Sequence, residues 1–135
     1  GVNKYHIIRA TLEAITYKVS DVLQAMDADS GITLSVLKVD GGASANNFLM
    51  QTQADVIQTP VNRPLCLETT ALGAAYLAGI QVGYWKDKEE IRRNWQINRR
   101  FESKIEEDYR KKLIKGWKKA VKCALAWTED AEDEL

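Results

Sequence analysis

The chain has 135 residues, of which 45% are hydrophobic and 28% charged, and its 19 basic residues balance its 19 acidic ones. This composition is typical of one modest globular domain, and the balanced charge gives no whole-chain field that favours nucleic acid. Cys66 and Cys123 lie far apart without metal-site spacing, which argues against zinc and against a disulfide scaffold. No apolar run approaches the ~20 residues that span a bilayer, and no signal peptide is visible at the start. We therefore expect a cytoplasmic protein.

The first predicted element is an amphipathic helix over residues 5–26. Its apolar positions recur in steps of three and four, which predicts one buried stripe: Ile8, Leu12, Ile15, Val19, Val22, Leu23 and Met26. Residues 27–31, with the sequence DADSG, predict the end of this helix. Residues 32–39 are short, rich in β-branched side chains and nearly continuously apolar, so they predict a strand covered on both faces.

The middle of the chain predicts a helix followed by an extended stretch. We expect the helix over residues 44–55, where Phe48, Leu49 and Met50 drive burial. Pro60 and Pro64 restrict the following stretch, residues 56–67, to short strand pieces or an edge strand. Strand, helix and strand in this order predict parallel pairing through a right-handed crossover.

A helix of small residues is predicted over residues 68–83, with Thr69 or Thr70 as its cap. Each glycine costs a helix roughly 1 kcal/mol relative to alanine, so the small residues indicate close approach to a sheet or another backbone. A short surface helix over residues 84–95 and a loop over residues 98–101 are expected next. A long helix then follows over residues 104–127, and its apolar face comprises Ile105, Tyr109, Leu113, Trp117, Val121 and Leu125.

The charged and aromatic residues of the last helix favour no particular ligand. Its basic stretch, residues 110–122, is interpreted as a solvated helix face, and the acidic residues 128–135 follow it. The chain has four tryptophans, and Trp117 is predicted to lie in the core because it falls on the apolar stripe. We find no internal repeat and no low-complexity segment.

The stretch DGGASANN, residues 40–47, is the strongest candidate for function. It follows a predicted parallel strand and opens a helix, which is where open α/β sheets bind ligands. Gly41 and Gly42 permit positive φ and close approach of a ligand to the backbone. The helix start suits a phosphate, and Asn46 and Asn47 supply amide donors and acceptors. Such a turn is more often purely structural, so both alternatives remain open on this pattern alone.

Other catalytic signatures are missing from the sequence. It contains no phosphate-binding P-loop, no GxGxxG, no HExxH and no GxSxG motif. His6 is the only histidine and is interpreted as a packing or surface residue. We therefore predict no catalytic residue and no metal ligand in this chain.

Two blocks resemble a known family. LKVDGGASANNFLMQTQADVIQTPVNRP, residues 37–64, and TTALGAAYLAGIQVGYW, residues 69–85, closely resemble the C-terminal part of the glycerol kinases in the FGGY carbohydrate kinase family. Residues 6–26 resemble the helix that carries that family's second signature, and residues 116–127 resemble the end of the glycerol kinases. The resemblance covers essentially the whole chain, in the family's order.

The resemblance implies the fold and the reaction. It implies an α/β fold, with residues 1–135 as one partial domain, the C-terminal part of the second actin-like (ribonuclease H-like) ATPase domain. The implied reaction is phosphorylation of glycerol to glycerol 3-phosphate with ATP and Mg²⁺. Gly42 would approach the nucleotide through its backbone, Asn46 would contact it through its side chain, and Gly41 would permit the turn.

The same resemblance places the phosphate loop, the glycerol contacts, most of the Mg²⁺ site and the catalytic aspartate of the family upstream of residue 1. We therefore expect this chain to be a piece of a kinase that is inactive alone. We also expect a homo-oligomer that binds neither nucleic acid nor membrane. Exposed apolar faces should make the isolated chain self-associate or loosen its first helix. The alternatives are a xylulose or gluconate kinase of the same family and a non-catalytic actin-like interaction module.

Overall fold

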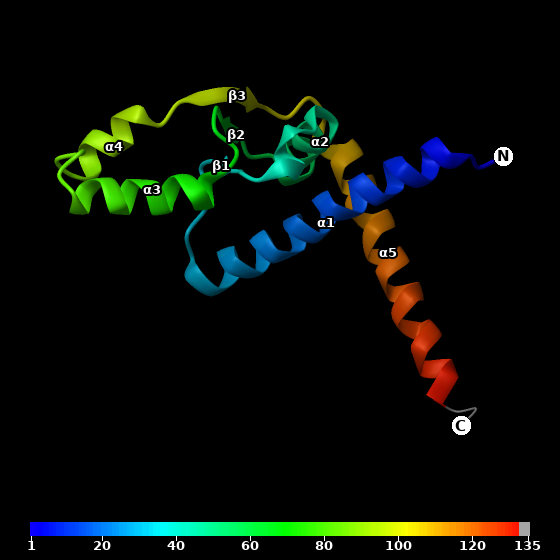
Figure 1. Ribbon diagram of the computed structural model, residues 1–135. Helices are drawn as coiled ribbons and strands as arrows, with labels where there is room; N and C mark the ends of the chain where they lie inside the picture. Colours follow the sequence, from blue (N-terminus) through cyan, green and yellow to red (C-terminus); the bar gives the residue numbers. More distant parts are fainter. Residues whose placement is uncertain (133–135) are drawn as a thin grey trace.

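The computed structural model describes residues 1–132, which form a small mixed sheet with flanking helices (Figure 1). α1 packs along α2, and α5 crosses α1 near its middle, while α3 and α4 extend together beyond the sheet. Within these residues, no helix is both long enough and apolar enough to cross a membrane. The elements in chain order are α1 (Lys4–Ser30), β1 (Leu37–Lys38), the 3₁₀ helix η1 (Gly42–Ala45), α2 (Asn47–Ile57), β2 (Val61–Pro64), α3 (Thr69–Gln81), α4 (Lys88–Asn94), β3 (Ile97–Phe101) and α5 (Glu107–Glu132).

The sheet has the strand order β1-β2-β3. β1 and β2 are parallel, as predicted, with Leu37 opposite Val61. The expectation that residues 98–101 form a loop is wrong, because they belong to β3, which pairs antiparallel with β2. β2 is therefore the central strand and not an edge. It tolerates Pro64 because the register shifts between Arg63 and Pro64, the kind of irregularity where a sheet accepts a proline.

The first predicted strand is much shorter than expected. Only Leu37–Lys38 is a strand, and Ile32 and Leu34 are 73% and 38% exposed. The expectation of a strand covered on both faces is therefore wrong for residues 32–36, which lie before the pairing with β2 and of which only Val36 is half-buried. α1, in contrast, continues to Ser30 and ends where Gly31 adopts φ 66° and donates its N–H to Asp27 O.

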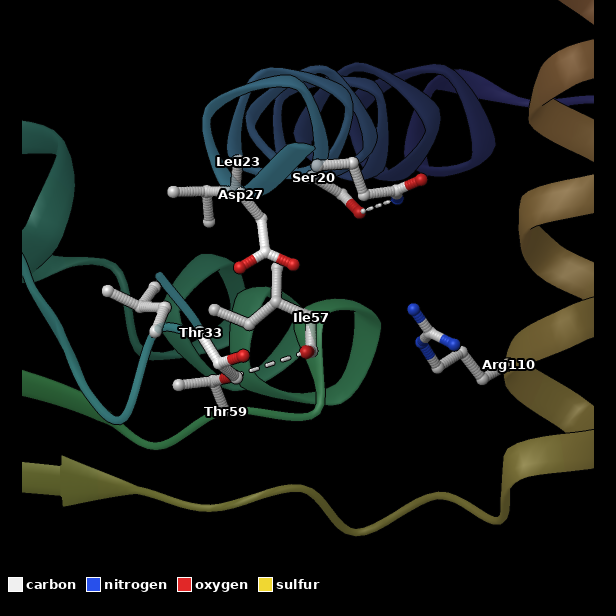
Figure 2. A pocket seen from close by; sticks show the side chains of 9 residues that line it. Ser20, Leu23, Asp27, Thr33, Ile57, Thr59 and Arg110 are labelled. Atoms are coloured by element: carbon white, nitrogen blue, oxygen red, sulfur yellow. Dashed lines mark hydrogen bonds between the residues drawn. The ribbon is translucent and has the colours of Figure 1, made fainter. Parts of the chain in front are cut away.

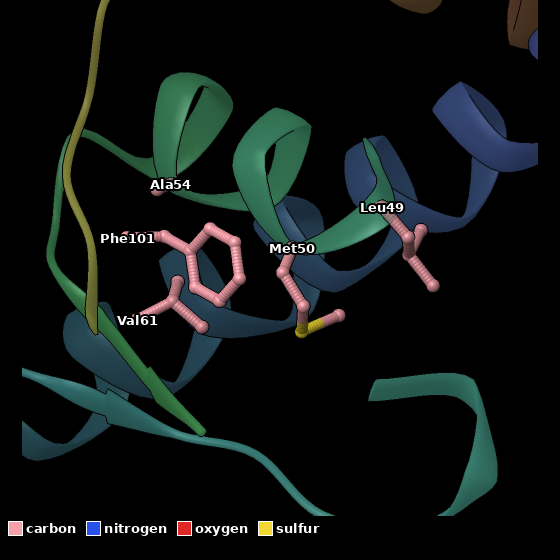
Figure 3. Packing of buried hydrophobic residues seen from close by; sticks show 5 residues of the cluster. All are labelled: Leu49, Met50, Ala54, Val61 and Phe101. Atoms are coloured by element: carbon pink, nitrogen blue, oxygen red, sulfur yellow. The ribbon is translucent and has the colours of Figure 1, made fainter. Parts of the chain in front are cut away.

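The hydrophobic core joins α2 to the strands. Figure 3 shows its five buried residues, Leu49, Met50, Ala54, Val61 and Phe101. The predicted burial of Leu49 and Met50 is confirmed, whereas Phe48 is 40% exposed. Phe48 lies on the other side of α2, next to the Arg9 guanidinium. α2 therefore holds the segment before it, residues 40–46, against the sheet.

α1 buries a face that overlaps only part of the predicted stripe, since Leu12, Val19 and Leu23 are half-buried and Leu12 packs against the core. Its buried residues are Thr16, Tyr17 and Ser20, because α2 and α5 contact that side. Four members of the predicted stripe are 45–60% exposed, so this expectation is wrong for them: Ile8, Ile15, Val22 and Met26.

The crossing of α1 and α5 is held by an aromatic pair. The rings of Tyr17 and Trp117 stack at 5.5 Å between centroids, and Trp117 Nε1 donates to Asp21 Oδ2 at 2.7 Å. Trp117 is half-buried at this contact. Burial of Tyr17 raises the pKa of its hydroxyl. The long C-terminal helix is confirmed, although Tyr109 and Leu125 on its predicted apolar face are 51% and 62% exposed.

α3 and α4 are largely exposed. The expected threonine cap of α3 is wrong, since Glu68 occupies the N-cap without a side-chain bond and Thr69 is the first helical residue. Among the described residues, the small side chains of α3 do not approach a sheet or a backbone. Only Gly79 is crowded, because a Cβ there would collide with the ring of Trp85. α4 buries no residue, as expected of a surface helix.

Candidate functional site

The glycine turn, defined as residues 40–46, follows β1 at its carboxyl end. Gly41 has φ 74° and ψ 169°, a backbone region that only glycine adopts readily. Gly42 begins η1, and an added Cβ at either glycine would meet no atom within 4 Å. Gly41 is thus required by conformation, whereas the backbone of Gly42 borders open space that a ligand could enter. The predicted strand–turn–helix arrangement is confirmed, although the α-helix begins at Asn47 after one 3₁₀ turn and not near Ser44.

The two asparagines have different surroundings. Asn46 is the N-cap of α2, and its Oδ1 accepts the N–H of Leu49 at 3.1 Å. This bond fixes the side chain at the helix start and leaves its Nδ2 as the group that could donate to a ligand. Asn47 Oδ1 instead accepts from Arg63 Nη1 at 3.0 Å. Of the two amides that the sequence offers, the oxygen of Asn47 is therefore engaged within the fold.

Further bonds fix the turn from its N-terminal side. The Ser44 hydroxyl, which is buried, donates to Gly41 O at 2.7 Å, and Ser44 N donates to the same oxygen at 3.1 Å. Gly41 N donates to Leu67 O at 2.9 Å, and the Thr69 hydroxyl donates to a carboxylate oxygen of Asp40. Asp40 and Gly41 are thereby tied to the residues that begin α3.

Arg63, which the sequence analysis did not identify, fixes the turn from its C-terminal side. Its Nη1 donates to Ser44 O at 3.0 Å and to Ala45 O at 3.1 Å, besides Asn47. Its Nε and Nη2 donate to Asn98 Oδ1 on β3. Asn98 is 35 residues away in the sequence, so no local pattern could have predicted the pair.

A separate cavity of about 170 Å³ lies between α1, α2 and α5 (Figure 2). Arg110 faces it, but its Nε donates to Val56 O at 2.6 Å and its Nη1 to Glu107 at 3.0 Å. The cavity adjoins residues that precede β1 and β2, whereas ligands of such sheets bind beyond the carboxyl ends of the strands. The glycine turn, at the carboxyl end of β1, is therefore the better candidate. The cavity is lined by Ser20, Leu23, Gln24, Asp27, Thr33, Leu34, Ile57, Thr59 and Arg110.

The other chemically reactive side chains that the structure describes form no second site. His6 is exposed and forms a capping box with Asn3 at the start of α1, so its interpretation as a surface residue is confirmed. Cys66 and Cys123 are free and exposed. Within residues 1–127, whose side chains the structure describes, no group of three or more His, Cys, Asp or Glu side chains is placed to hold a metal ion.

Comparison with known protein sequences gives a consistent result. The profile described as "FGGY family of carbohydrate kinases, C-terminal domain" matches residues 1–82. The glycerol kinase of Agathobacter rectalis is 65% identical over 130 residues, 96% of this chain and 26% of that protein. The glycerol kinase of Bacillus subtilis is 59% identical over 127 residues, again 26% of its length. The chain thus spans about a quarter of the length of the curated relatives that it matches.

Comparison with solved structures gives the same fold. The crystal structure of Plasmodium falciparum glycerol kinase with ADP superposes with a TM-score of 0.78 at 34% identity, over 90% of this chain and 25% of that one. Xylulose kinase from Lactobacillus acidophilus superposes with a TM-score of 0.67 at 22% identity, over 93% of this chain and 26% of that one. The second likeness concerns the fold alone. The α/β fold with a short sheet and flanking helices is therefore the one found in carbohydrate kinases.

Proposed function

Because this chain belongs to the FGGY family of carbohydrate kinases, we propose that the full-length protein transfers the γ-phosphoryl group of ATP to glycerol. The product is glycerol 3-phosphate. The observation that carries this proposal is 58–65% identity to glycerol kinases along nearly the whole chain. Residues 1–135 then form the C-terminal part of the second actin-like domain, and they supply one wall of the nucleotide site.

In this proposal the glycine turn binds the adenosine part of ATP. Gly42 offers a bare backbone to the ligand, Gly41 makes the turn possible, and Asn46 donates through Nδ2. The open space beside Gly42 and the capped, fixed position of Asn46 support these roles. The ADP present in the Plasmodium falciparum structure supports the nucleotide as ligand. Phosphoryl transfer depends chiefly on positioning and on charge neutralisation, and the contribution of this chain is to position the nucleotide.

Mg²⁺ enters the proposal with the nucleotide. When bound, it neutralises charge on the β- and γ-phosphates. The described residues form no cluster that fits such an ion, and the family resemblance implies that most of its site lies outside this chain. No side chain of the glycine turn is proposed as a general base.

We further propose that the isolated chain self-associates. Large exposed apolar surfaces mark interaction sites, and in this chain alone α1 exposes Ile8, Ile15, Val22 and Met26 on one side. Sedimentation of a polypeptide limited to residues 1–135 tests this: a dimer or larger assembly is expected, and a monomer at all concentrations would contradict it. The homo-oligomer expected of the full-length protein stays a prediction. The expected cytoplasmic location stays a prediction.

Substrate choice is tested by measuring ADP release from ATP by the full-length protein with glycerol, xylulose or gluconate. We expect release to depend on glycerol, with much lower rates for the two sugars. A preference for xylulose or gluconate would replace the proposed substrate, and no ADP release with any of the three acceptors would favour the interaction module. A polypeptide limited to residues 1–135 serves as the control and is expected to transfer no phosphoryl group.

A further inference from the structure

We propose that Arg63 is a positioning residue for the nucleotide, which holds Asn46 in its binding position without touching the ligand. This inference rests on the nucleotide site proposed above. It assigns a role to a residue of β2 that neither the turn motif nor the match to the family identifies.

The bonds of Arg63 bracket Asn46 along the chain. Nη1 donates to the carbonyl of Ala45, directly before Asn46, and to the side chain of Asn47, directly after it. The same nitrogen also binds Ser44 O. The bracketing leaves the Asn46 amide unaffected, because its oxygen is held by Leu49 N. Arg63 therefore sets where the Asn46 backbone lies, while the helix cap sets where its side chain points.

The segment needs such a partner because η1 is only four residues long. The last carbonyls of any helix lack partners within it, and a cation near that end is favourable. Ser44 O and Ala45 O are carbonyls of this kind, and both accept from the guanidinium. Without Arg63, the passage from η1 into α2 would lose three bonds, including the one to Asn47.

Arg63 is itself held rigidly. It lies on the central strand β2, and Asn98 Oδ1 accepts from its Nε at 3.1 Å and its Nη2 at 2.9 Å. The guanidinium also lies 5.3 Å from the centroid of the Phe101 ring. The Arg63 guanidinium is planar, with Nε and Nη2 held by Asn98 on one edge while Nη1 donates on the other side. The single ammonium group of lysine cannot reproduce this geometry.

The effect of losing Arg63 should be confined to one side of the turn. Gly41 is held independently, through Leu67 O and through the bond between Asp40 and Thr69. Replacing Arg63 should therefore release residues 44–47 and leave residues 40–41 in place. A general loss of structure would release both ends together.

The test compares Arg63→Lys with Arg99→Lys in the full-length protein. Arg99 is the cross-strand partner of Arg63 and also lies over the Phe101 ring, at 4.7 Å. Among the described residues it makes no side-chain hydrogen bond, which makes it a matched control. We expect Arg63→Lys to raise the KM for ATP about tenfold, equivalent to about 1.4 kcal/mol. The KM for glycerol should change less than about twofold, and Arg99→Lys should leave both values unchanged.

Amide hydrogen exchange without nucleotide gives a readout besides activity. In Arg63→Lys, residues 44–47 should exchange faster while Gly41 keeps its protection. Asn98→Ala keeps Arg63 but removes the acceptor that holds its guanidinium. This variant should change the KM for ATP and the exchange of residues 44–47 in the same direction by a smaller amount. It replaces Arg63→Lys as the test if that variant does not fold.

An unchanged KM for ATP in both Arg63→Lys and Asn98→Ala would overturn the inference. So would a parallel rise of the KM values for ATP and glycerol together with a lowered Tm, because that pattern indicates a merely structural role. If the wild-type protein phosphorylates neither glycerol nor a sugar, the proposed function fails. The exchange data and ADP affinity would then still decide whether Arg63 positions residues 44–47.

Discussion

Replacing each glycine of the turn with alanine should separate folding from nucleotide binding. Gly41→Ala forces a side chain into a backbone region that costs about 1–3 kcal/mol, and no steric clash adds to this because the added Cβ meets no atom within 4 Å. Gly42 does not have positive φ and has the same open surroundings. Gly42→Ala should therefore leave the free energy of unfolding unchanged, or raise it by about 0.4–1 kcal/mol through the unfolded chain.

For nucleotide affinity the order of the two variants should be reversed, with Gly42→Ala more affected than Gly41→Ala. The Cβ of Gly42→Ala projects into the space that the adenosine is proposed to occupy, so we expect the Kd for ADP to rise at least tenfold, about 1.4 kcal/mol. Urea denaturation and ADP titration of both variants in the full-length protein provide the two measurements. Wild-type ADP affinity in a folded Gly42→Ala variant would refute the reasoning, as would wild-type stability of Gly41→Ala.

Three further predictions concern the core, an ionisable group and the proposed ligand contact. Phe101→Ala should lower the free energy of unfolding by about 3–5 kcal/mol in urea denaturation, because Phe101 is 2% exposed and closes the core; a loss below about 1 kcal/mol would contradict this. Burial raises the pKa of Tyr17, so the contribution of this residue to stability is full below about pH 10 and is lost as pH rises through the folded pKa. Tyr17→Phe should therefore weaken the fall in the free energy of unfolding measured from about pH 8 to about pH 11. An identical fall in the variant would exclude Tyr17 as its source. Asn46→Asp should keep the cap, since a carboxylate can also accept from Leu49 N, yet reduce ADP affinity because the amide donor is lost; unchanged affinity with unchanged stability would remove Asn46 from the site.

The helices could be predicted from the sequence because their periodic patterns extend over many residues. α1, α2, α3 and α5 all lie where the patterns place them, within a few residues. The strands could not be predicted as well. β3 has the sequence INRRF, and only Phe101 is buried, so its strand character depends on pairing with β2 and not on its own composition. Residues 32–36 alternate apolar and polar side chains and lie outside the pairing with β2, which begins at Leu37, and so they form no strand.

The glycine turn could be predicted from the sequence, but the hydrogen bonds of Arg63 that hold it could not. Adjacent glycines after an apolar strand indicate a turn open to a ligand; Gly41 has the expected positive φ, Gly42 does not, and both have open surroundings. The turn pattern alone does not distinguish Asn46 from Asn47, whereas the family resemblance singles out Asn46; in the structure Asn46 caps α2 and the Asn47 oxygen accepts from Arg63. The partners of Arg63 come from η1, α2 and β3, and only the completed sheet brings these together.

The most direct test of the central claim is the position of ADP on this chain. Mg-ADP is titrated into the full-length protein, and the protection of backbone amides from hydrogen exchange is compared with and without the nucleotide. New protection of residues 41–46 is the predicted result, with little change along α5. Protection elsewhere in residues 1–132, with none at the glycine turn, would contradict the assignment of Gly41, Gly42 and Asn46 to the nucleotide site.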